Sequence, residues 1–359
     1  MLLHDVEWRV ERGDVVVRDG RIAAVGWLDP KRSAGAARAR GSAGRKRAEI
    51  LVRDCTGCLV MPGLIQAHVH LCQTLFRGLG DDLRLEDWLA RRWHGAAGGR
   101  LRWCFAPRFV PSCSGPLLRA ASDLAERHGA QLHTHAAETI VERETVLRTT
   151  GLEEIAYLDS VGIAGPRAAV AHCVWVDQHE IARLAAQGTN VVHCPSSNLK
   201  LGSGVARIPE MLQAGCRVAL GSDGAACSNR LDAFAEMRLA ALIQKPRHGA
   251  DVLSAGQVLE LATAGGARAL GLQEELGAIA VGRCADLVVL DLRGPHLAPT
   301  PPDPVSHLVY AAQPSDVRDV FVDGRAVVLD RDLLTVSLEE VVREAARCGA
   351  ELRRRTGLA

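Results

Sequence analysis

The sequence lacks both a strong charge imbalance and a long apolar run. Its 43 Lys and Arg residues nearly balance 42 Asp and Glu residues, which gives a formal net charge of +1. A balanced chain has no general attraction to nucleic acid or to a membrane surface. No apolar run is long enough for a transmembrane helix, and residues 1–20 lack the apolar core of a signal peptide. We therefore expect a cytoplasmic protein with no nucleic-acid partner and no membrane partner.

The eleven cysteines lack the paired spacing of a disulfide framework. Cys55 and Cys58 form a CxxC, but no second CxxC or matching Cys/His pair completes a zinc site. Redox chemistry and half of a zinc site remain alternatives for this pair. The setting "DCTGC" is typical of a turn before a strand and favours a structural role. The other cysteines are scattered, several of them in apolar runs, which predicts reduced thiols packed as small hydrophobic side chains.

Both ends of the chain have the pattern of short strands. The segment "DVVVRDGRIAAVG" alternates around Asp19-Gly20, and "VRDVFVDGRAVV" alternates around Asp323-Gly324, two strong hairpin signals. We expect residues 1–58 and 283–335 to form one small β-sandwich domain, followed by a C-terminal helix over 336–359.

Residues 29–48 hold seven basic residues and few apolar ones. This composition is compatible with an anion-binding arm, but it is more typical of a solvated loop.

The middle of the chain, residues 59–282, alternates apolar strand candidates with segments of helical periodicity, such as 115–129 and 231–245. Such alternation is typical of an α/β fold with a parallel sheet, and of a (β/α)8-type barrel in particular. A complete barrel has eight strands, whereas the sequence offers about six, so we expect an incomplete barrel. The six candidates are 59–67, 101–106, 130–135, 168–174, 189–194 and 216–222.

Two histidines lie two positions apart in "MPGLIQAHVHL". In a strand, residues i and i+2 project from the same face, so His68 and His70 would point the same way. Two aligned imidazoles suit a first-row metal, most often zinc. An isolated HxH is equally compatible with two structural histidines at a strand end.

Further polar side chains follow other apolar strand candidates. They are Arg108, His135, His172, His193 and Asp223. The carboxyl ends of barrel strands carry the active site in this architecture, so the coincidence favours a functional site over packing. Three histidines and one aspartate could hold one metal ion and leave a position open for water, whose pKa the metal lowers toward ~7. Glu138, three residues after His135, could move a proton without ligating the metal.

Six motifs together resemble the amidohydrolase superfamily, in particular its aminohydrolase branch, which includes methylthioadenosine/S-adenosylhomocysteine deaminases, guanine deaminases and triazine hydrolases. The motifs follow the order of the family over nearly the whole chain. They are "PGLIQAHVH", "HTHAAET", "VAHC", "HCPSSNLKLGSG", "LGSDGAACSNRLDAFAEMR" and "LGAIAVGRCADLVVLD".

The resemblance implies a role for each matching residue. His68, His70, His135 and Asp223 would bind one divalent metal, usually Zn²⁺, with Fe²⁺ as the alternative. Glu138 would protonate the ring nitrogen beside the attacked carbon, and His172 would hydrogen-bond the attacking hydroxide or the developing oxygen. Asp223 would also pass the water proton to the leaving ammonia. A homodimer is common in the family.

The chain departs from the family pattern in two places. Arg108 replaces the histidine of a Pro-His pair found in the S-adenosylhomocysteine deaminases. It could bind a carbonyl, carboxylate or triazine-like acceptor of the substrate, or it could pair with a neighbouring carboxylate. Compared with the family, strands two and three and their helices are also missing between "LRLEDWL" and the strand at 101–106.

These features predict a metal-dependent deaminase acting on a small amino-substituted nitrogen heterocycle, either a purine or an adenosine-like compound. A triazine-type amino- or chlorohydrolase is the alternative within enzymes. An inactive metal-binding remnant, disabled by the missing barrel units, is the alternative outside them.

Overall fold

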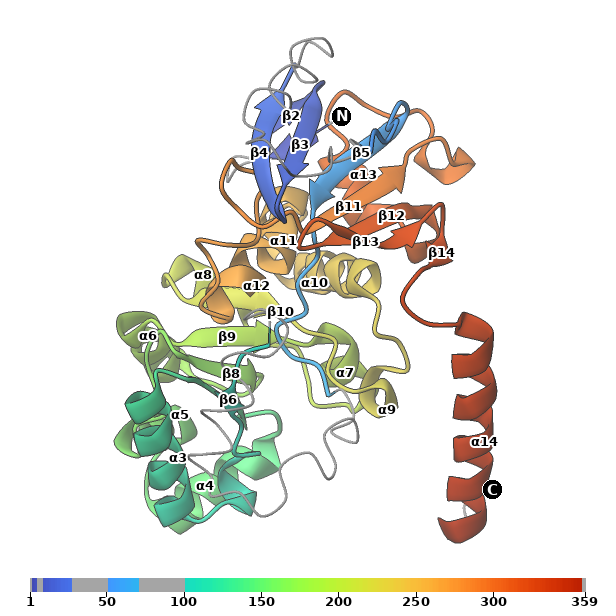
Figure 1. The fold of residues 1–359 in the computed structure, drawn as a ribbon. Coiled ribbons are helices and arrows are strands. Elements are labelled where there is room, and N and C mark those ends of the chain that lie inside the picture. The colour runs from blue at the N-terminus through green and yellow to red at the C-terminus, as the bar shows by residue number, and fades with distance from the viewer. Residues whose placement is uncertain (1, 5–8, 28–50, 71–100, 357–359) are drawn as a thin grey trace. The chain divides into compact units, whose positions relative to one another are not determined.

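The computed structural model describes residues 2–4, 9–27, 51–70 and 101–356, which form two compact units (Figure 1). Unit 1 contains residues 1–63, 278–304 and 313–359, and unit 2 contains residues 64–277 and 305–312. Two segments that bear on the predictions from sequence lie outside the described residues. They are the basic segment 29–48 and residues 71–100, which precede the strand predicted at 101–106.

Strands from both ends of the chain meet in one seven-stranded sheet of unit 1, because β5 pairs antiparallel with β11 and parallel with β1. The strands, in sheet order, are β14 (Asp332–Leu333), β13 (Arg325–Leu329), β12 (Val317–Val322), β11 (Leu287–Asp291), β5 (Cys58–Pro62), β1 (Leu2–His4) and β2 (Arg9–Glu11). A separate hairpin consists of β3 (Asp14–Arg18) and β4 (Arg21–Gly26). Unit 1 also contains η4 (Pro295–Leu297), η5 (Pro314–Asp316) and α14 (Leu338–Thr356).

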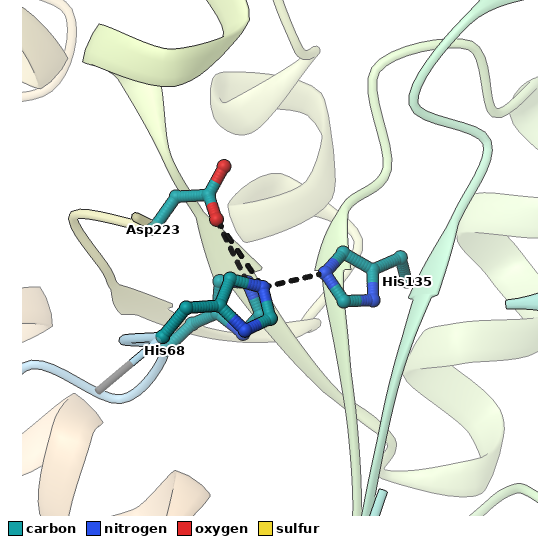
Figure 2. A group of neighbouring side chains, drawn as sticks. His68, His135 and Asp223 are labelled. Atoms are coloured by element: carbon teal, nitrogen blue, oxygen red, sulfur yellow. Dashed lines mark hydrogen bonds and ion pairs between the residues drawn. The ribbon is translucent and has the colours of Figure 1, made fainter. Parts of the chain in front are cut away.

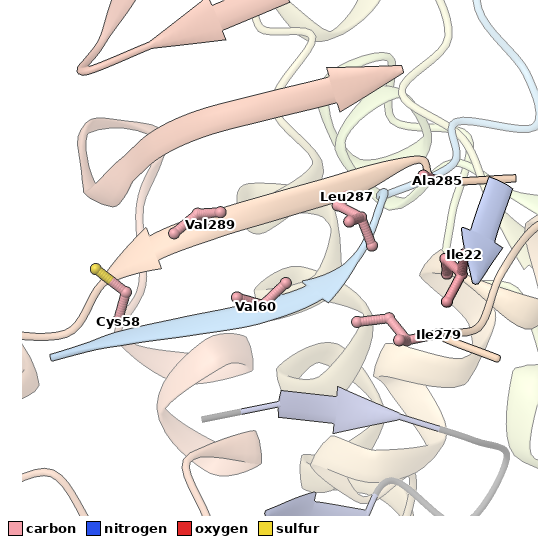
Figure 3. Packing of buried hydrophobic residues seen from close by; sticks show 7 residues of the cluster. All are labelled: Ile22, Cys58, Val60, Ile279, Ala285, Leu287 and Val289. Carbon is pink, nitrogen blue, oxygen red and sulfur yellow. The ribbon is translucent and has the colours of Figure 1, made fainter. Parts of the chain in front are cut away.

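Both hairpins predicted at Asp-Gly pairs are present. Asp19 and Gly20 join β3 to β4, and Asp323 and Gly324 join β12 to β13, all four with positive φ. This backbone is the one that a two-residue hairpin turn requires. The hairpin β3–β4 contributes Ile22 to a buried core shared with β5 and β11 (Figure 3). The core residues are Ile22, Cys58, Val60, Ile279, Ala285, Leu287 and Val289.

The strand expected at 59–67 as part of the barrel is found in a different place. Its first half, β5, pairs residue by residue with β11, with Val60 opposite Val289. Only the residues that follow belong to unit 2, where the amide of Ala67 donates to the carbonyl of Leu220 at 2.9 Å. The prediction of one continuous barrel strand was therefore wrong, because an apolar run by itself does not specify its partner strand.

Unit 2 is built on a parallel sheet whose strands follow the order of the chain, as expected for an α/β fold with helical crossovers. The strands are β6 (Cys104–Phe105), β7 (Gln131–Ala136), β8 (Ala168–His172), β9 (Asn190–His193) and β10 (Arg217–Leu220). The helices are η3 (Val110–Ser112), α3 (Gly115–His128), α4 (Ile140–Thr150), α5 (Glu154–Ser160), α6 (Gln178–Gln187), α7 (Pro195–Lys200), α8 (Ile208–Gln213), α9 (Ala225–Ser228), α10 (Ala233–His248), α11 (Ala255–Ala262), α12 (Ala264–Ala269) and α13 (Val305–Tyr310).

Local signals set the ends of these helices. Helix α3 begins after Ser114, whose hydroxyl accepts from the amide of Leu117, and it ends at Gly129, which has a φ of 59°. These are an N-cap and a left-handed C-cap. Helices α3, α4 and α6 each stop at a glycine with positive φ. After α3 and α6 the next strand, β7 or β9, begins two residues beyond that glycine.

The segment after β5 reaches the carboxyl end of β10. The amide of Asp223 donates to the carbonyl of His68 at 3.1 Å, and Val69 and Asp223 form a parallel bridge. This pairing brings the HxH beside Asp223, although more than 150 positions separate them in the sequence. No helix among the described residues is long and apolar enough to cross a membrane.

Candidate metal centre and active site

Four of the polar residues predicted at strand ends converge on one point of unit 2. One possible ligand atom from each of His68, His70, His135 and Asp223 lies within 4.8 Å of every other. Figure 2 shows His68, His135 and Asp223 approaching this point from three separate segments of the chain. His68, His135 and Asp223 are buried, whereas the His70 side chain is 44% exposed.

The spacing of the donor atoms fits a single ion. Asp223 Oδ1 lies 3.6 Å from His68 Nε2 and 3.4 Å from His70 Nε2, and His70 Nε2 lies 3.2 Å from His135 Nε2. Two donors at about 2.1 Å from one tetrahedral zinc ion would be separated by roughly 3.4 Å. All three histidines use Nε2, and this atom of His68 is buried without a hydrogen-bond partner among the described residues. The four residues therefore fit one divalent metal.

The other ring nitrogens of two ligands are held by neighbours. His135 Nδ1 lies 2.7 Å from the carbonyl oxygen of Arg108. Because a carbonyl can only accept, Nδ1 carries the proton and Nε2 keeps a lone pair for a metal. His68 Nδ1 lies 2.6 Å from His133 Nε2, and the two rings stack with their centroids 4.7 Å apart. His133 thus fixes the ring of His68.

Burial favours the neutral form of His68, His133 and His135. Burial lowers the pKa of His68, and burial with the neighbouring ring of His68 lowers the pKa of His135 to about 3. Burial also lowers the pKa of His133 well below its usual range. Neutral imidazole is the form that ligates metals, so the environment prepares the ligands before an ion binds.

Asp223 is held in an unusual backbone conformation, with a φ of 57° immediately after the Gly221-Ser222 pair. Non-glycine residues in this region are uncommon and concentrate at functional sites. Ser197 donates to Asp223 Oδ2 at 2.6 Å, which leaves Oδ1 facing the histidines. Burial alone would raise the pKa of Asp223, but the interaction with the neighbouring His68 ring and the hydrogen bond from Ser197 outweigh it and lower the pKa. Asp223 is therefore ionised, the form in which it could ligate a metal.

Glu138 and His172 lie side by side next to the ligands. Glu138 Oε2 lies 3.8 Å from His172 Nε2, and Glu138 Oε1 accepts from Ser203 Oγ at 3.3 Å. His172, at the end of β8, is buried, and its Nδ1 lies 2.8 Å from Asn198 Oδ1. The His172 ring centroid is 5.4 Å from that of His135. A carboxyl group that does not ligate the metal is thus available beside it.

Arg108 contacts the candidate site through its backbone carbonyl and not through its side chain. Its carbonyl accepts from His135 Nδ1 and from the amide of His135 at 3.1 Å. The Arg108 side chain is exposed, and its guanidinium carbon lies 5.9 Å above the ring of Phe109. Among the described residues no carboxylate forms an ion pair with it. The role predicted for its guanidinium in substrate binding stays a prediction.

Several residues of the site were not among those predicted from the sequence. His133 carried a usable signal, because it stands two positions before His135 in a strand and so shares its face. Ser197 and Asn198 come from the first turn and middle of α7, and nothing in "CPSSNLK" identifies them as partners of Asp223 and His172. Both contacts depend on where α7 packs. The predicted strand-end residue His193 is buried on β9 with neither ring nitrogen hydrogen-bonded among the described residues.

Comparison with known proteins places this arrangement in a family. The model of the amidohydrolase family matches residues 89–327. The chain belongs to the amidohydrolase family. It is 36% identical to the 5-methylthioadenosine/S-adenosylhomocysteine deaminase of Syntrophobacter fumaroxidans, over 93% of this chain and 92% of the relative. It is 34% identical to the 5'-deoxyadenosine deaminase of Methanothermobacter thermautotrophicus, over 96% of this chain and 95% of the relative.

A solved structure supports the same conclusion about the fold. The adenosine deaminase from Xanthomonas campestris with bound zinc superimposes with a TM-score of 0.81 at 26% identity, covering 98% of this chain and 97% of that one. The predicted resemblance is therefore confirmed, and the chain has the α/β fold of a metal-dependent hydrolase. Family membership and the His/Asp cluster together make it a metal-dependent enzyme of this family.

The alignments with relatives are longer than this chain. The alignment with the Syntrophobacter protein spans 416 positions, whereas this chain has 359 residues. The relative therefore contains positions that this chain lacks.

Proposed function

We propose that this chain is a hydrolytic deaminase of an adenosine-like substrate. The observation that carries the proposal is the position of Glu138, whose carboxyl lies 3.8 Å from His172 beside four convergent ligand atoms without being one of them. A deaminase needs this combination of a metal-ligand set and a separate proton-transfer group. The relatives at 34–36% identity are named as deaminases of methylthioadenosine, S-adenosylhomocysteine and 5'-deoxyadenosine.

The ligand set favours zinc, with Fe²⁺ as the alternative, because imidazole nitrogens with one carboxylate suit both ions. A divalent ion held by His68, His70, His135 and Asp223 would act as a Lewis acid and lower the pKa of a bound water. Ser197 keeps the Asp223 carboxylate directed at that position, and His133 does the same for the His68 ring.

The protein groups would move the protons of the reaction. Water adds to the carbon that bears the amino group, the carbon–nitrogen bond breaks, and ammonia leaves. In this mechanism Glu138 gives a proton to the ring nitrogen beside that carbon. Asp223 takes one proton of the attacking water and passes it to the leaving amino group, and the other proton of the water returns to Glu138 as the carbonyl forms. His172, fixed by Asn198, directs its Nε2 at the developing oxygen. The exposed Arg108 guanidinium would contact a polar group of the small-molecule substrate.

We also propose that the barrel has lost two strand–helix units within the segment before β6, as the family pattern predicts. The longer alignments with relatives support this. All four candidate ligands, Glu138 and His172 remain, which favours an active enzyme over a metal-binding remnant. No observation favours the triazine-type hydrolase to the same extent.

Ammonia release tests the proposal. The purified, zinc-loaded chain would be incubated with adenosine, 5'-deoxyadenosine, methylthioadenosine, S-adenosylhomocysteine, guanine and an aminotriazine. We expect release from one or more adenosine compounds and loss of the adenine absorbance as the amino group is replaced. Release from the aminotriazine alone would support the triazine alternative. Full metal occupancy with no release from any compound would support the inactive remnant. A version with the family's missing units restored shows whether the shortened barrel limits turnover.

A further inference from the structure

Two buried glutamates lie directly behind the segment that carries Glu138. Glu154, the first residue of α5, is fully buried, and Glu142, in the first turn of α4, is 8% exposed. Glu154 Oε2 accepts from the amide of Ala137 at 2.9 Å, and Glu142 Oε2 accepts from the amide of Glu138 at 2.8 Å. The two carboxyl groups thus hold two consecutive amides of the turn between His135 and Glu138.

The Oε1 atoms of Glu142 and Glu154 have no donor in the described part of the chain, so a proton is needed to satisfy them. Glu142 Oε1 and Glu154 Oε1 are both buried, and neither has a hydrogen-bond donor among the described residues. Because their Oε2 atoms bond the amides of consecutive residues, the two carboxyl groups lie beside each other. Because an ionised carboxylate can only accept, two carboxylates cannot bond unless one of them is protonated. A single shared proton would satisfy both Oε1 atoms at once.

Among the described residues no cation forms an ion pair with Glu142 or Glu154. Arg143, on the same helix as Glu142, is bonded to Glu153 at 2.9 Å and to Asp177 at 2.8 Å, and its third carboxylate neighbour is Glu180 at 3.6 Å. Burial and the charge of Glu142 raise the pKa of Glu154 to about 9. Burial also raises the pKa of Glu142, although the amides of Glu138 and Thr139 counteract this.

The turn held by the pair is strained and densely bonded. Ala137 has a φ of 48°, and its carbonyl accepts from the amides of Val174 and Trp175 at 2.9 Å each. A non-glycine residue keeps this conformation only where its surroundings enforce it. The hydrogen bond from the Ala137 amide to Glu154 is therefore one of the contacts that hold Ala137 in this conformation.

We propose that Glu142 and Glu154 share one proton and act as a positioning pair that fixes the turn carrying Glu138. The proton resides on Glu154, because Glu154 is fully buried whereas Glu142 is 8% exposed, and burial disfavours the charged form of a carboxyl group. Glu154 then donates to Glu142 Oε1 and accepts from Ala137. The catalytic part of this inference depends on the proposed deaminase function, whereas the shared proton does not.

Three variants separate this arrangement from a simple packing role. In Glu154→Gln, the amide can still donate to Glu142 and accept from Ala137, so we expect kcat within about 3-fold of wild type. Glu154→Leu leaves the Ala137 amide unbonded and displaces the turn, and Glu142→Leu does the same to the Glu138 amide. For both we expect kcat to fall about 10–100-fold with a smaller change in KM and an unchanged metal content. Glu153→Gln, next to Glu154 but partly exposed, is the matched control and should behave as wild type.

The proton itself is observed by infrared difference spectroscopy at pH 8. The wild-type spectrum minus the Glu154→Gln spectrum should contain the carbonyl band of a protonated carboxylic acid, and the difference for Glu153→Gln should not. Absence of that band, or a loss of kcat in Glu154→Gln as large as in Glu154→Leu, would overturn the proposal. If wild type releases no ammonia from any adenosine compound, the deaminase function fails, while the infrared result still decides whether the proton is shared. If Glu154→Leu does not fold, Glu142→Leu and the infrared difference for Glu154→Gln still decide the proposal.

Discussion

His70 and His135 face each other with their Nε2 atoms 3.2 Å apart. Since His135 Nδ1 bonds the carbonyl of Arg108, its Nε2 has a lone pair directed at His70. Asp223 Oδ1 lies 3.4 Å from the same His70 atom. Electron-rich atoms brought this close are stabilised by a shared cation.

Removing one ligand should abolish metal binding. We expect about one zinc ion per wild-type chain by elemental analysis, and very little in Asp223→Ala. Metal at 100-fold above its Kd stabilises a folded protein by about 2.7 kcal/mol, so zinc should raise the Tm of wild type and not that of the variant. Asp159→Ala, which loses only a surface pair with Arg183, is the control. A zinc response of the same size in Asp223→Ala would contradict the assignment.

Glu138→Gln should separate metal binding from turnover. The amide keeps the shape of the side chain but cannot transfer a proton, so we expect kcat to fall by about 10²–10⁴-fold. The metal content should stay unchanged, because Glu138 is not among the four convergent residues. Glu144→Gln, which changes an exposed carboxyl on the helix α4 that follows Glu138, serves as control. Wild-type turnover in Glu138→Gln would exclude Glu138 as the proton-transfer group.

Gly221 allows His68 to approach the end of β10. A Cβ atom at position 221 would lie 2.8 Å from His68 Cβ and 2.9 Å from its carbonyl oxygen, closer than folded proteins allow. Gly221→Ala should therefore displace His68, weaken zinc affinity and destabilise the fold by roughly 1–3 kcal/mol. At Gly224 the nearest atom would be His70 Cβ at an ordinary 3.7 Å, so Gly224→Ala should keep its zinc. Zinc titration of the two variants makes the comparison, and equal affinities would disprove this role of Gly221.

Ser197 should tune the metal site without belonging to it. Ser197→Ala removes the 2.6 Å bond to Asp223 Oδ2, and loss of such supporting bonds costs about 10–100-fold in metal affinity. Competition with a chelator measures this affinity. Ser196→Ala is the neighbouring control, since Ser196 meets Glu236 through its backbone amide. Unchanged zinc affinity in Ser197→Ala would show that the orientation of Asp223 does not depend on this bond.

His193 should make the protein less stable in acid. Burial lowers its pKa in the folded protein to about 3, against about 6.5 in an unfolded chain. Between these values the unfolded state binds more protons, so the free energy of unfolding falls as the pH decreases below about 6.5. From pH 6.5 to 4.5, wild type should lose roughly 2 kcal/mol more than His193→Leu in denaturant unfolding. Parallel pH profiles for the two proteins would contradict the prediction.

The sequence by itself determined the local chemistry of this protein. The spacing of His68 and His70, the Asp-Gly turns of two hairpins, and the alternation of strands with capped helices all follow from residues a few positions apart. Strand-end histidines could be predicted to converge because parallel strands present their carboxyl ends at one edge. The family motifs then suggested a role for each matching residue.

Only the tertiary structure decided which distant groups meet. The apolar run at 59–67 is divided between two units, because β5 pairs with β11 while Ala67 and Val69 pair beyond it with the β10 segment. The partners of Asp223 and His172 come from α7, whose position depends on helix packing. The Glu142–Glu154 pair joins two helices behind one turn. Such contacts depend on packing between segments far apart in the chain, which local periodicity cannot encode.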